Sequence, residues 1–240
     1  MRRLLPCMLI PLLLAAILWL SNPLYHGSII CIVLDASGSM DWPLGNVSKI
    51  DAAKTAIRDV LPVLGDRDEA ALVAFYTCGD IRVECPLTSN ITEISIALED
   101  IAPCGATPFG DALITSWETL NVSPSISYKQ PVIILVTDGA ETCVDPWYPV
   151  EAARACWLSS QEKLIIHTIY IGEEDSEILM EIANMTGGVY ATVRSLEELE
   201  EALRYTLEAK GREVYLLLPG LLGLLCMLIR SASNMPLSDP

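Results

Sequence analysis

The stretch "VLDASGSMDWP", Val33–Pro43, ends an apolar run with one acid and two hydroxyl side chains. The run, Ile29–Leu34, is rich in Val and Ile and does not alternate with polar residues. This pattern is typical of a strand that is buried on both faces of a parallel sheet. Asp35, Ser37 and Ser39 follow the run directly. Because ligands of such sheets bind at the carboxyl ends of strands, we expect these three side chains to face a ligand.

Other segments of strand length surround this one in the sequence. Apolar runs recur at Ala70–Thr77, Val132–Val136, Leu164–Ile171 and Val189–Val193. Ile81–Leu87 instead alternates between polar and apolar residues and follows a short turn, so we expect it to be an antiparallel edge strand.

The segments between these runs have apolar residues at helical spacing. This spacing predicts helices at Ile50–Leu64, Thr92–Ile101, Asp111–Leu120, Pro149–Ser159 and Asp175–Met185, and a last one after the capping box Ser195–Glu198. Asp111 and Asp175 are expected to cap their own helices. The sequence therefore predicts a doubly wound, Rossmann-like α/β domain over residues 27–211, with a mostly parallel sheet and one antiparallel edge strand.

Two uncharged segments flank this domain in the chain of 240 residues, of which 52% are hydrophobic. Leu4–Leu20 and Val214–Ile229 are near the lower length limit of about 17–25 residues for a membrane helix. We expect residues 1–21 to be a transmembrane anchor or a cleaved signal segment. Residues 214–229 are expected to form a second transmembrane helix, and 230–240 a short tail.

Charge and glycosylation sequons bear on the location of the domain. Positive charge is typical of the cytoplasmic side of a membrane helix, and the two ends of the chain carry Arg2, Arg3 and Arg230. Both ends are therefore expected in the cytoplasm and the domain outside the cell membrane. Lys210 and Arg212, which would lie on the other side of the second segment, weaken this argument. Four Asn-X-Ser/Thr sequons and an even number of cysteines in the domain favour the same extracytoplasmic location. The net charge of −16 argues against nucleic acid as a partner.

Two further loops carry oxygen-bearing side chains. Thr107 lies in "CGATPFGDAL", just before a predicted helix, and Asp138 follows the Val132–Val136 strand. Together with Asp35, Ser37 and Ser39 they supply hydroxyls and carboxylates without sulfur or imidazole, which suits Mg²⁺, Mn²⁺ or Ca²⁺. Each motif alone would more often form a turn, but the three together predict a metal site. With few carboxylates around it, the ion would attract a further acidic ligand from a partner.

The motifs "DASGSM", "GATPFGDAL" and "VTDGAETC" resemble, in order and spacing, the metal-ion-dependent adhesion site of von Willebrand factor A (VWA) domains. The resemblance extends over about residues 29–210. It implies that Ser37, Ser39 and Thr107 bind the ion directly, and that Asp35 and Asp138 bind it directly or through water. It also implies the VWA fold and a protein partner that donates an acidic side chain to the metal.

Finer likenesses concern membrane assemblies and disulfides. "CPLT", "TPFGDAL" and the flanking segments resemble membrane-anchored VWA proteins associated with MoxR-type ATPases and aerotolerance operons. "DGAETC" is similar to exported prokaryotic VWA proteins, some of them named for calcium-activated channels, and this likeness implies a Cys143–Cys156 disulfide. Cys78 and Cys85 flank the predicted hairpin turn and are a second candidate pair, with Cys104 as a competitor. Cys31 is expected to be a free core thiol.

We consider three functions on this basis. The first is a membrane-tethered binding module, without enzymatic activity, that engages a protein through its metal. The second is a subunit of an ATPase-linked or channel-like membrane complex. The third is a Mg²⁺-dependent, phosphatase-like hydrolase with Asp35 as nucleophile. That chemistry requires a second acid two residues later, where this chain has Ser37, and the sequence has neither a P-loop nor a nucleophile elbow.

Overall fold

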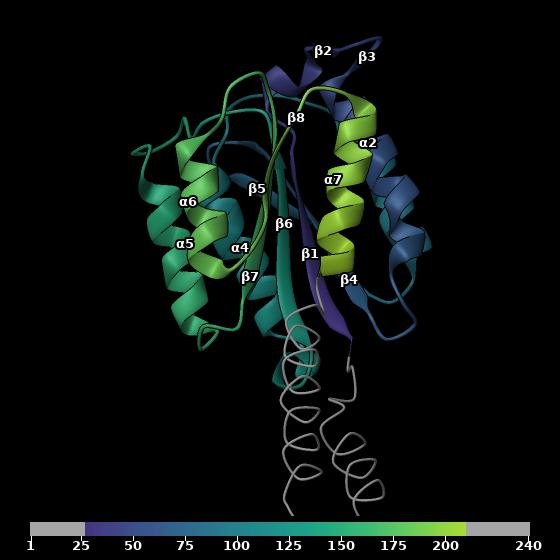
Figure 1. Cartoon of the computed structure of the whole chain (residues 1–240), viewed down its shortest axis with the longest axis vertical. Coiled ribbons are helices and arrows are strands. Elements are labelled where there is room, and N and C mark those ends of the chain that lie inside the picture. The colour runs from purple at the N-terminus through teal and green to yellow at the C-terminus, as the bar shows by residue number, and fades with distance from the viewer. Residues whose placement is uncertain (1–26, 210–240) are drawn as a thin grey trace, which may run out of the picture.

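A computed structural model describes residues 27–209 of the chain. Its centre is a six-stranded sheet in the order β5-β4-β1-β6-β7-β8 (Figure 1). The strands are β1 (Ser28–Asp35), β4 (Glu69–Thr77), β5 (Asp80–Thr88), β6 (Gln130–Thr137), β7 (Ile165–Ile171) and β8 (Tyr190–Val193). All neighbouring pairs are parallel except β4 and β5. The predicted doubly wound sheet with one antiparallel edge strand is confirmed.

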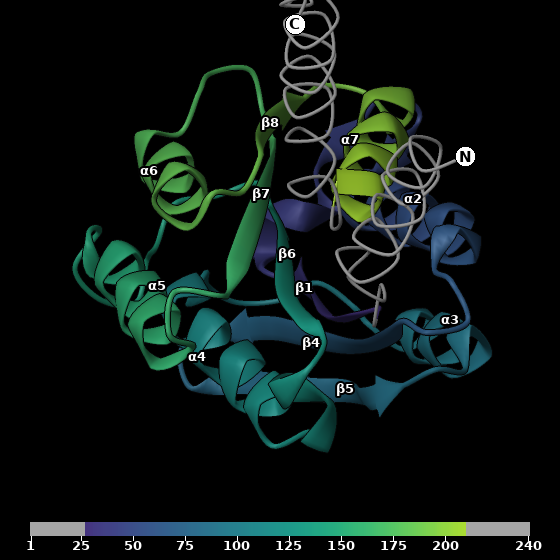
Figure 2. The ribbon, with the colours of Figure 1, turned by 60° about the horizontal axis from the view of Figure 1, so that its bottom comes forward.

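Helices cover both faces of the sheet (Figures 1 and 2). One face packs against α2 (Lys49–Val60), α3 (Ile91–Glu99) and α7 (Leu196–Ala209). The other packs against α4 (Phe109–Asn121), α5 (Tyr148–Ser159) and α6 (Glu177–Thr186). Successive β1 side chains enter opposite cores: Ile30 and Ile32 pack on the α2 side, and Ile29 and Cys31 on the α4 side. Both faces of this strand are thus dry, which is why its sequence lacks polar alternation.

Short elements connect and extend these layers. The quoted stretch continues from β1 into a 3₁₀ turn, Gly38–Asp41, and then into a two-stranded ribbon of β2 (Pro43–Leu44) and β3 (Val47–Ser48). Two other 3₁₀ turns follow α2 and α4, at Leu61–Val63 and Pro124–Ser127. None of these was predicted, because segments of two to four residues are too short for an apolar period to appear.

Two predicted helix caps are wrong. Ser176, not Asp175, caps α6 with its hydroxyl, while the Asp175 carboxylate accepts a hydrogen bond of 2.7 Å from Thr192. Asp111 lies inside the first turn of α4 and accepts a hydrogen bond of 2.7 Å from the Tyr148 hydroxyl. In both cases a tertiary partner competes successfully for the carboxylate. The Ser195 hydroxyl does accept from the Glu198 amide, as predicted.

The predicted membrane segments, Leu4–Leu20 and Val214–Ile229, and the tail 230–240 lie outside the described residues. Within residues 27–209, no helix combines the length and apolar character that crossing a membrane requires.

His167 is a buried ionisable side chain in β7, only 2% exposed. Its Nδ1 accepts a hydrogen bond from the Val189 amide, so the neutral ring carries its proton on Nε2, which has no partner in the described residues. Burial lowers the pKa of His167 to about 4. The folded protein therefore holds a neutral imidazole across most of the acidic range.

Acidification should destabilise the protein through His167. Between pH 6.5 and pH 4 the unfolded chain binds a proton that the folded chain excludes, so stability is lost as the pH falls. We expect this side chain to lower the free energy of unfolding by roughly 2–3 kcal/mol between pH 7 and pH 4.5. Urea unfolding at both pH values, compared with His167→Gln, measures this contribution. An equal loss of stability in the variant would contradict the prediction.

Candidate metal centre

Three loops meet at the carboxyl edge of the central strands. β1 and β6 are parallel neighbours, with Leu34 opposite Val136, so the loops after Asp35 and Thr137 emerge side by side. The third loop, residues 102–108, lies against the first: the Cys104 amide donates to the Ala36 carbonyl over 2.7 Å, and the Gly38 amide donates to the Gly105 carbonyl over 3.3 Å. β1 lies between β4 and β6, where the winding of the sheet reverses, which is the usual position for a ligand in this class of sheet.

Asp35 connects the ends of the two strands. Its side chain is fully buried; Oδ1 accepts a hydrogen bond of 2.7 Å from the Ser37 amide, and Oδ2 accepts one of 2.5 Å from the Thr137 hydroxyl. Burial raises the pKa of Asp35 to about 6, although the hydrogen bonds from Ser37 and Thr137 oppose the shift. Ionised at neutral pH, Asp35 is an uncompensated charge in a dry setting, and a nearby cation would stabilise it.

Ser37, Ser39 and Asp138 form one continuous cluster of oxygen atoms. The Ser37 and Ser39 hydroxyl oxygens are 3.2 Å apart, and Ser39 donates to Asp138 Oδ1 over 2.6 Å. The 3₁₀ turn that begins at Gly38 directs both serines to the same side. Residues 99 positions apart in the sequence are therefore in direct contact.

Thr107 joins this cluster from the third loop. Its backbone pairs with Thr142: the Thr107 amide donates to the Thr142 hydroxyl over 2.8 Å, and the Thr142 amide donates to the Thr107 carbonyl over 3.3 Å. Its hydroxyl oxygen lies so close to Gly139 that a Cβ there would come within 3.3 Å of it. The lack of a side chain at Gly139 thus lets Thr107 approach the Asp138 loop. Hydrogen bonds thus link Asp35, Ser37, Ser39 and Asp138, and Thr107 lies beside Gly139, the neighbour of Asp138, whereas Asp111 is bonded to Tyr148.

Lys49 is a member of the site that sequence reasoning missed. It is the first residue of α2, and its ammonium lies 2.6 Å from Asp138 Oδ2 and 5.5 Å from the centre of the Trp42 ring. The Asp138 side chain is fully buried and that of Lys49 is 15% exposed, so the ion pair is well shielded from solvent. One oxygen of Asp138 therefore accepts a hydrogen bond from Ser39, and the other forms an ion pair with Lys49.

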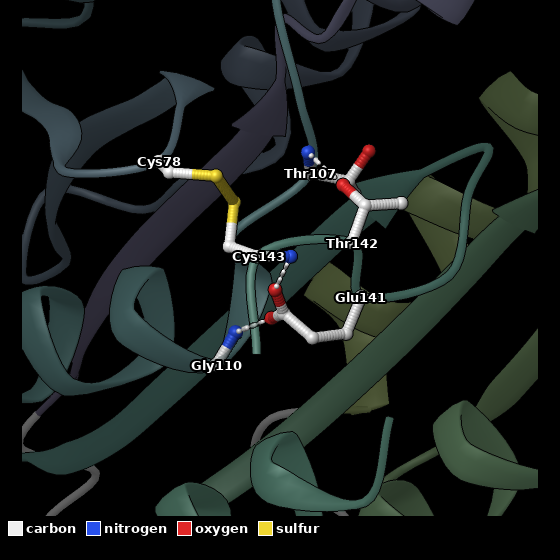
Figure 3. Close-up of a disulfide and its surroundings, with 6 residues drawn as sticks. All are labelled: Cys78, Thr107, Gly110, Glu141, Thr142 and Cys143. Atoms are coloured by element: carbon white, nitrogen blue, oxygen red, sulfur yellow. Dashed lines mark hydrogen bonds between the residues drawn. A yellow bond between two sulfur atoms is a disulfide. The ribbon is translucent and has the colours of Figure 1, made fainter. Parts of the chain in front are cut away.

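The loop after Asp138 is braced by Glu141 and a disulfide (Figure 3). The buried Glu141 carboxylate accepts hydrogen bonds from the Cys143 amide over 2.9 Å and from the Gly110 amide over 3.1 Å. Cys143 forms a disulfide with Cys78, which lies in the turn between β4 and β5. The loop is therefore fixed on one side to the start of α4 and on the other to the β4–β5 turn. Sequence reasoning did not identify Glu141, Thr142 or Thr137 as supports of the site.

Both predicted disulfide pairings are wrong, because Cys78 and Cys143 pair with each other instead. Cys85 is a buried free thiol within β5, opposite Leu72, and its side chain packs in the α2-side core. Cys156 is a buried free thiol of α5 in the other core. Neither position faces the edge where Cys78 and Cys143 meet. Cys104 is free and exposed, and Cys31 is the free core thiol that was expected.

The donor set fits a hard divalent cation. Hydroxyls from Ser37, Ser39 and Thr107 and carboxylates from Asp35 and Asp138 provide oxygen atoms only, as Mg²⁺, Mn²⁺ and Ca²⁺ prefer. Across residues 27–209 no cluster of three or more His, Cys, Asp or Glu side chains has the geometry to hold a metal. A metal at this edge would accordingly depend on the hydroxyl oxygens.

Comparisons with known proteins agree with this geometry. Residues 30–141 match the family model described as the von Willebrand factor type A domain. The mouse calcium-activated chloride channel regulator 3A-1 is 26% identical over 165 residues, which cover 67% of this chain but only 17% of that protein.

Solved structures resemble the fold as well. An aerotolerance-related membrane protein from Bacteroides fragilis is 21% identical with a TM-score of 0.62, covering 76% of this chain and 99% of that one. Proximal thread matrix protein 1 from the mussel byssus, with a zinc-occupied MIDAS motif, is 23% identical with a TM-score of 0.59, covering 81% and 50%. The family match over residues 30–141, the sheet order and these structures lead to one conclusion: the described part of the chain has the von Willebrand factor type A fold.

Proposed function

We propose that this protein binds a divalent cation through Ser37, Ser39, Thr107, Asp35 and Asp138, and uses the ion to bind an acidic side chain of a partner protein. The observation that carries the proposal is the contact network Ser37–Ser39–Asp138 at the carboxyl edge of the sheet, with Thr107 beside it. Mg²⁺, Mn²⁺ and Ca²⁺ are the candidate ions, and the zinc in the mussel protein is consistent with a divalent cation in this fold.

The five residues would have different roles in binding the ion, and their hydrogen bonds indicate these roles. The Asp35 oxygens accept hydrogen bonds from Ser37 and Thr137, so Asp35 fixes the Ser37 turn and would use its remaining lone pairs to bind the ion directly or through water. The three hydroxyls carry no charge, so direct ligation by them does not itself neutralise the positive charge of the ion. Such an ion favours a carboxylate as its remaining ligand, which is the chemical basis for an acidic residue on the partner.

A membrane location outside the cytoplasm, with anchors at one or both ends of the chain, completes this proposal. It is supported by the apolar segments in the sequence and by the likeness to a protein described as an aerotolerance-related membrane protein. A role as a subunit of an ATPase-linked or channel-like complex is the second candidate, favoured by the likeness to a channel regulator. A phosphatase-like reaction is disfavoured because Ser37, which contacts Ser39, occupies the position where a second acid would be required.

The disulfide has a specific place in this proposal. Cys143 is adjacent to Thr142, which holds the backbone of Thr107, and Glu141 fixes the same loop to Gly110 (Figure 3). Cys78 supplies the fixed point for this loop on the β4–β5 turn. We infer that the disulfide keeps Thr107 in position for the cation, in addition to stabilising the fold.

Removing the Thr107 hydroxyl should weaken cation binding. Thr107→Val keeps the shape of the side chain but not its oxygen, whereas Thr107→Ser keeps the oxygen. Isothermal titration with Mg²⁺ and Mn²⁺ should show a loss of about tenfold or more for the valine variant, equivalent to about 1.4 kcal/mol, and a small change for the serine variant. Equal affinity of the valine variant and the wild type would contradict the assignment of Thr107 as a ligand.

Partner binding should depend on the same cation. A pull-down from solubilised membranes with the full chain should recover a partner in Mg²⁺ and lose it in EDTA, because the ion supplies the contact. Asp35→Ala and Thr107→Val should lose the partner even in Mg²⁺, while Thr107→Ser retains it. A partner that stays bound in EDTA would argue against a metal-bridged interaction.

Replacing both Cys78 and Cys143 by serine should lower stability and weaken cation binding together. The disulfide joins two cysteines that are 65 positions apart in the sequence. In the chain-entropy description, closing a loop of that length contributes about 4 kcal/mol to the free energy of unfolding. Cys104→Ser, at an exposed free thiol, is the matched control and should change neither quantity. Urea unfolding and Mg²⁺ titration measure the two effects. Unaltered cation affinity in the double variant would limit the disulfide to a purely structural role.

A further inference from the structure

Lys49 introduces a positive charge into the site where a cation is proposed to bind. Its ammonium is within 2.6 Å of Asp138 Oδ2, and the other oxygen of the same carboxylate is bonded to Ser39. A divalent ion held by the Ser39 hydroxyl and by Asp138 would lie close to the ammonium. Two cations at such short range repel each other, and shielding from solvent strengthens the repulsion.

The same ion pair satisfies a requirement of the fold. The Asp138 side chain is fully buried, and a buried carboxylate without a counter-charge is strongly destabilising. Lys49 supplies that charge, and Asp138 in turn anchors Ser39. Lys49 can therefore hold the loops in their arrangement before any metal binds.

The backbone of Lys49 is fixed, but its side chain is not. Ser48 caps α2, and the Lys49 amide donates to the Trp42 carbonyl over 2.9 Å, which ties the start of the helix to the end of the 3₁₀ turn. The four-carbon side chain reaches inward beside Trp42, a residue that is 65% exposed. Rotation about its single bonds would move the ammonium to solvent without any movement of the helix.

We propose that Lys49 is an internal competitor of the metal: its ion pair with Asp138 and the bound cation exclude each other, so that binding of the cation displaces the ammonium toward solvent. The inference rests on the cation site proposed above. It assigns Lys49 two effects, since the residue keeps the site formed when no ion is bound and sets the cation concentration at which the site fills.

Removal of the charge tests the competition directly. Lys49→Met keeps the length of the side chain without the ammonium, and Lys54→Met is the matched control, because Lys54 lies on the same helix and donates to the exposed Glu99 carbonyl. Isothermal titration of the full chain with Mg²⁺ should show that Lys49→Met binds at least about tenfold more tightly than the wild type. Lys54→Met should match the wild type. Unchanged or weaker binding by Lys49→Met overturns the inference.

A measurement on the wild-type protein avoids dependence on the folding of that variant. Amine-reactive labelling with mass spectrometry reports whether the Lys49 ammonium is paired, with Lys54 as the internal reference. Mg²⁺ should raise labelling of Lys49 several-fold over labelling in EDTA, and Thr107→Val should remove this increase. Labelling that is unchanged or lower in Mg²⁺, in a protein that binds Mg²⁺ by titration, overturns the inference.

The two proposals fail in distinguishable ways. If the wild type, Thr107→Ser and Lys49→Met all show no Mg²⁺ binding, the cation site itself is contradicted. A second result is that the wild type binds Mg²⁺, Thr107→Val binds it weakly or not at all, and Lys49→Met binds it no more tightly than the wild type. In that case the cation site is supported and only the competition by Lys49 is contradicted.

Discussion

The arrangement of the site depends on the two hydrogen bonds that the Asp35 carboxylate accepts. One of its oxygens accepts from the amide of Ser37, and the other accepts from the hydroxyl of Thr137 at the end of the neighbouring strand. A single buried side chain therefore shapes the first loop and fixes it to the second. This is possible only because β1 and β6 are parallel and in register, so that both strands end at the same level. The apolar β1 sequence, dry on both faces, in turn places Asp35 at the centre of the sheet.

Much of this architecture follows from the sequence alone. Apolar runs without polar alternation identify the inner strands, and the alternating Ile81–Leu87 segment identifies the antiparallel edge. The same logic places Asp35 and Asp138 at one edge, because parallel strands present their carboxyl ends together. The helix caps at Asp111 and Asp175 were not predictable in this way, since Tyr148 and Thr192 compete for these carboxylates from distant parts of the chain.

The supports of the site required three-dimensional information. In sequence, Lys49 is an ordinary residue at the start of an amphipathic helix, and its partner Asp138 lies 89 positions later. Cys78 is nearest in sequence to Cys85, but strand geometry turns Cys85 into the core. The pairing of Cys78 with Cys143 becomes understandable only from the strand order. β4 and β6 flank β1 on opposite sides, so the loops that follow them meet above it.

The Cys78–Cys143 disulfide also closes one part of the chain into a covalent ring. The chain from residue 78 to residue 143 is a closed ring that carries Thr107 and Asp138, while Asp35, Ser37 and Ser39 lie on the open chain before it. A backbone cut anywhere between residues 78 and 143 would leave both pieces joined through sulfur. All five residues of the proposed cation site would therefore stay covalently joined for as long as the disulfide is intact.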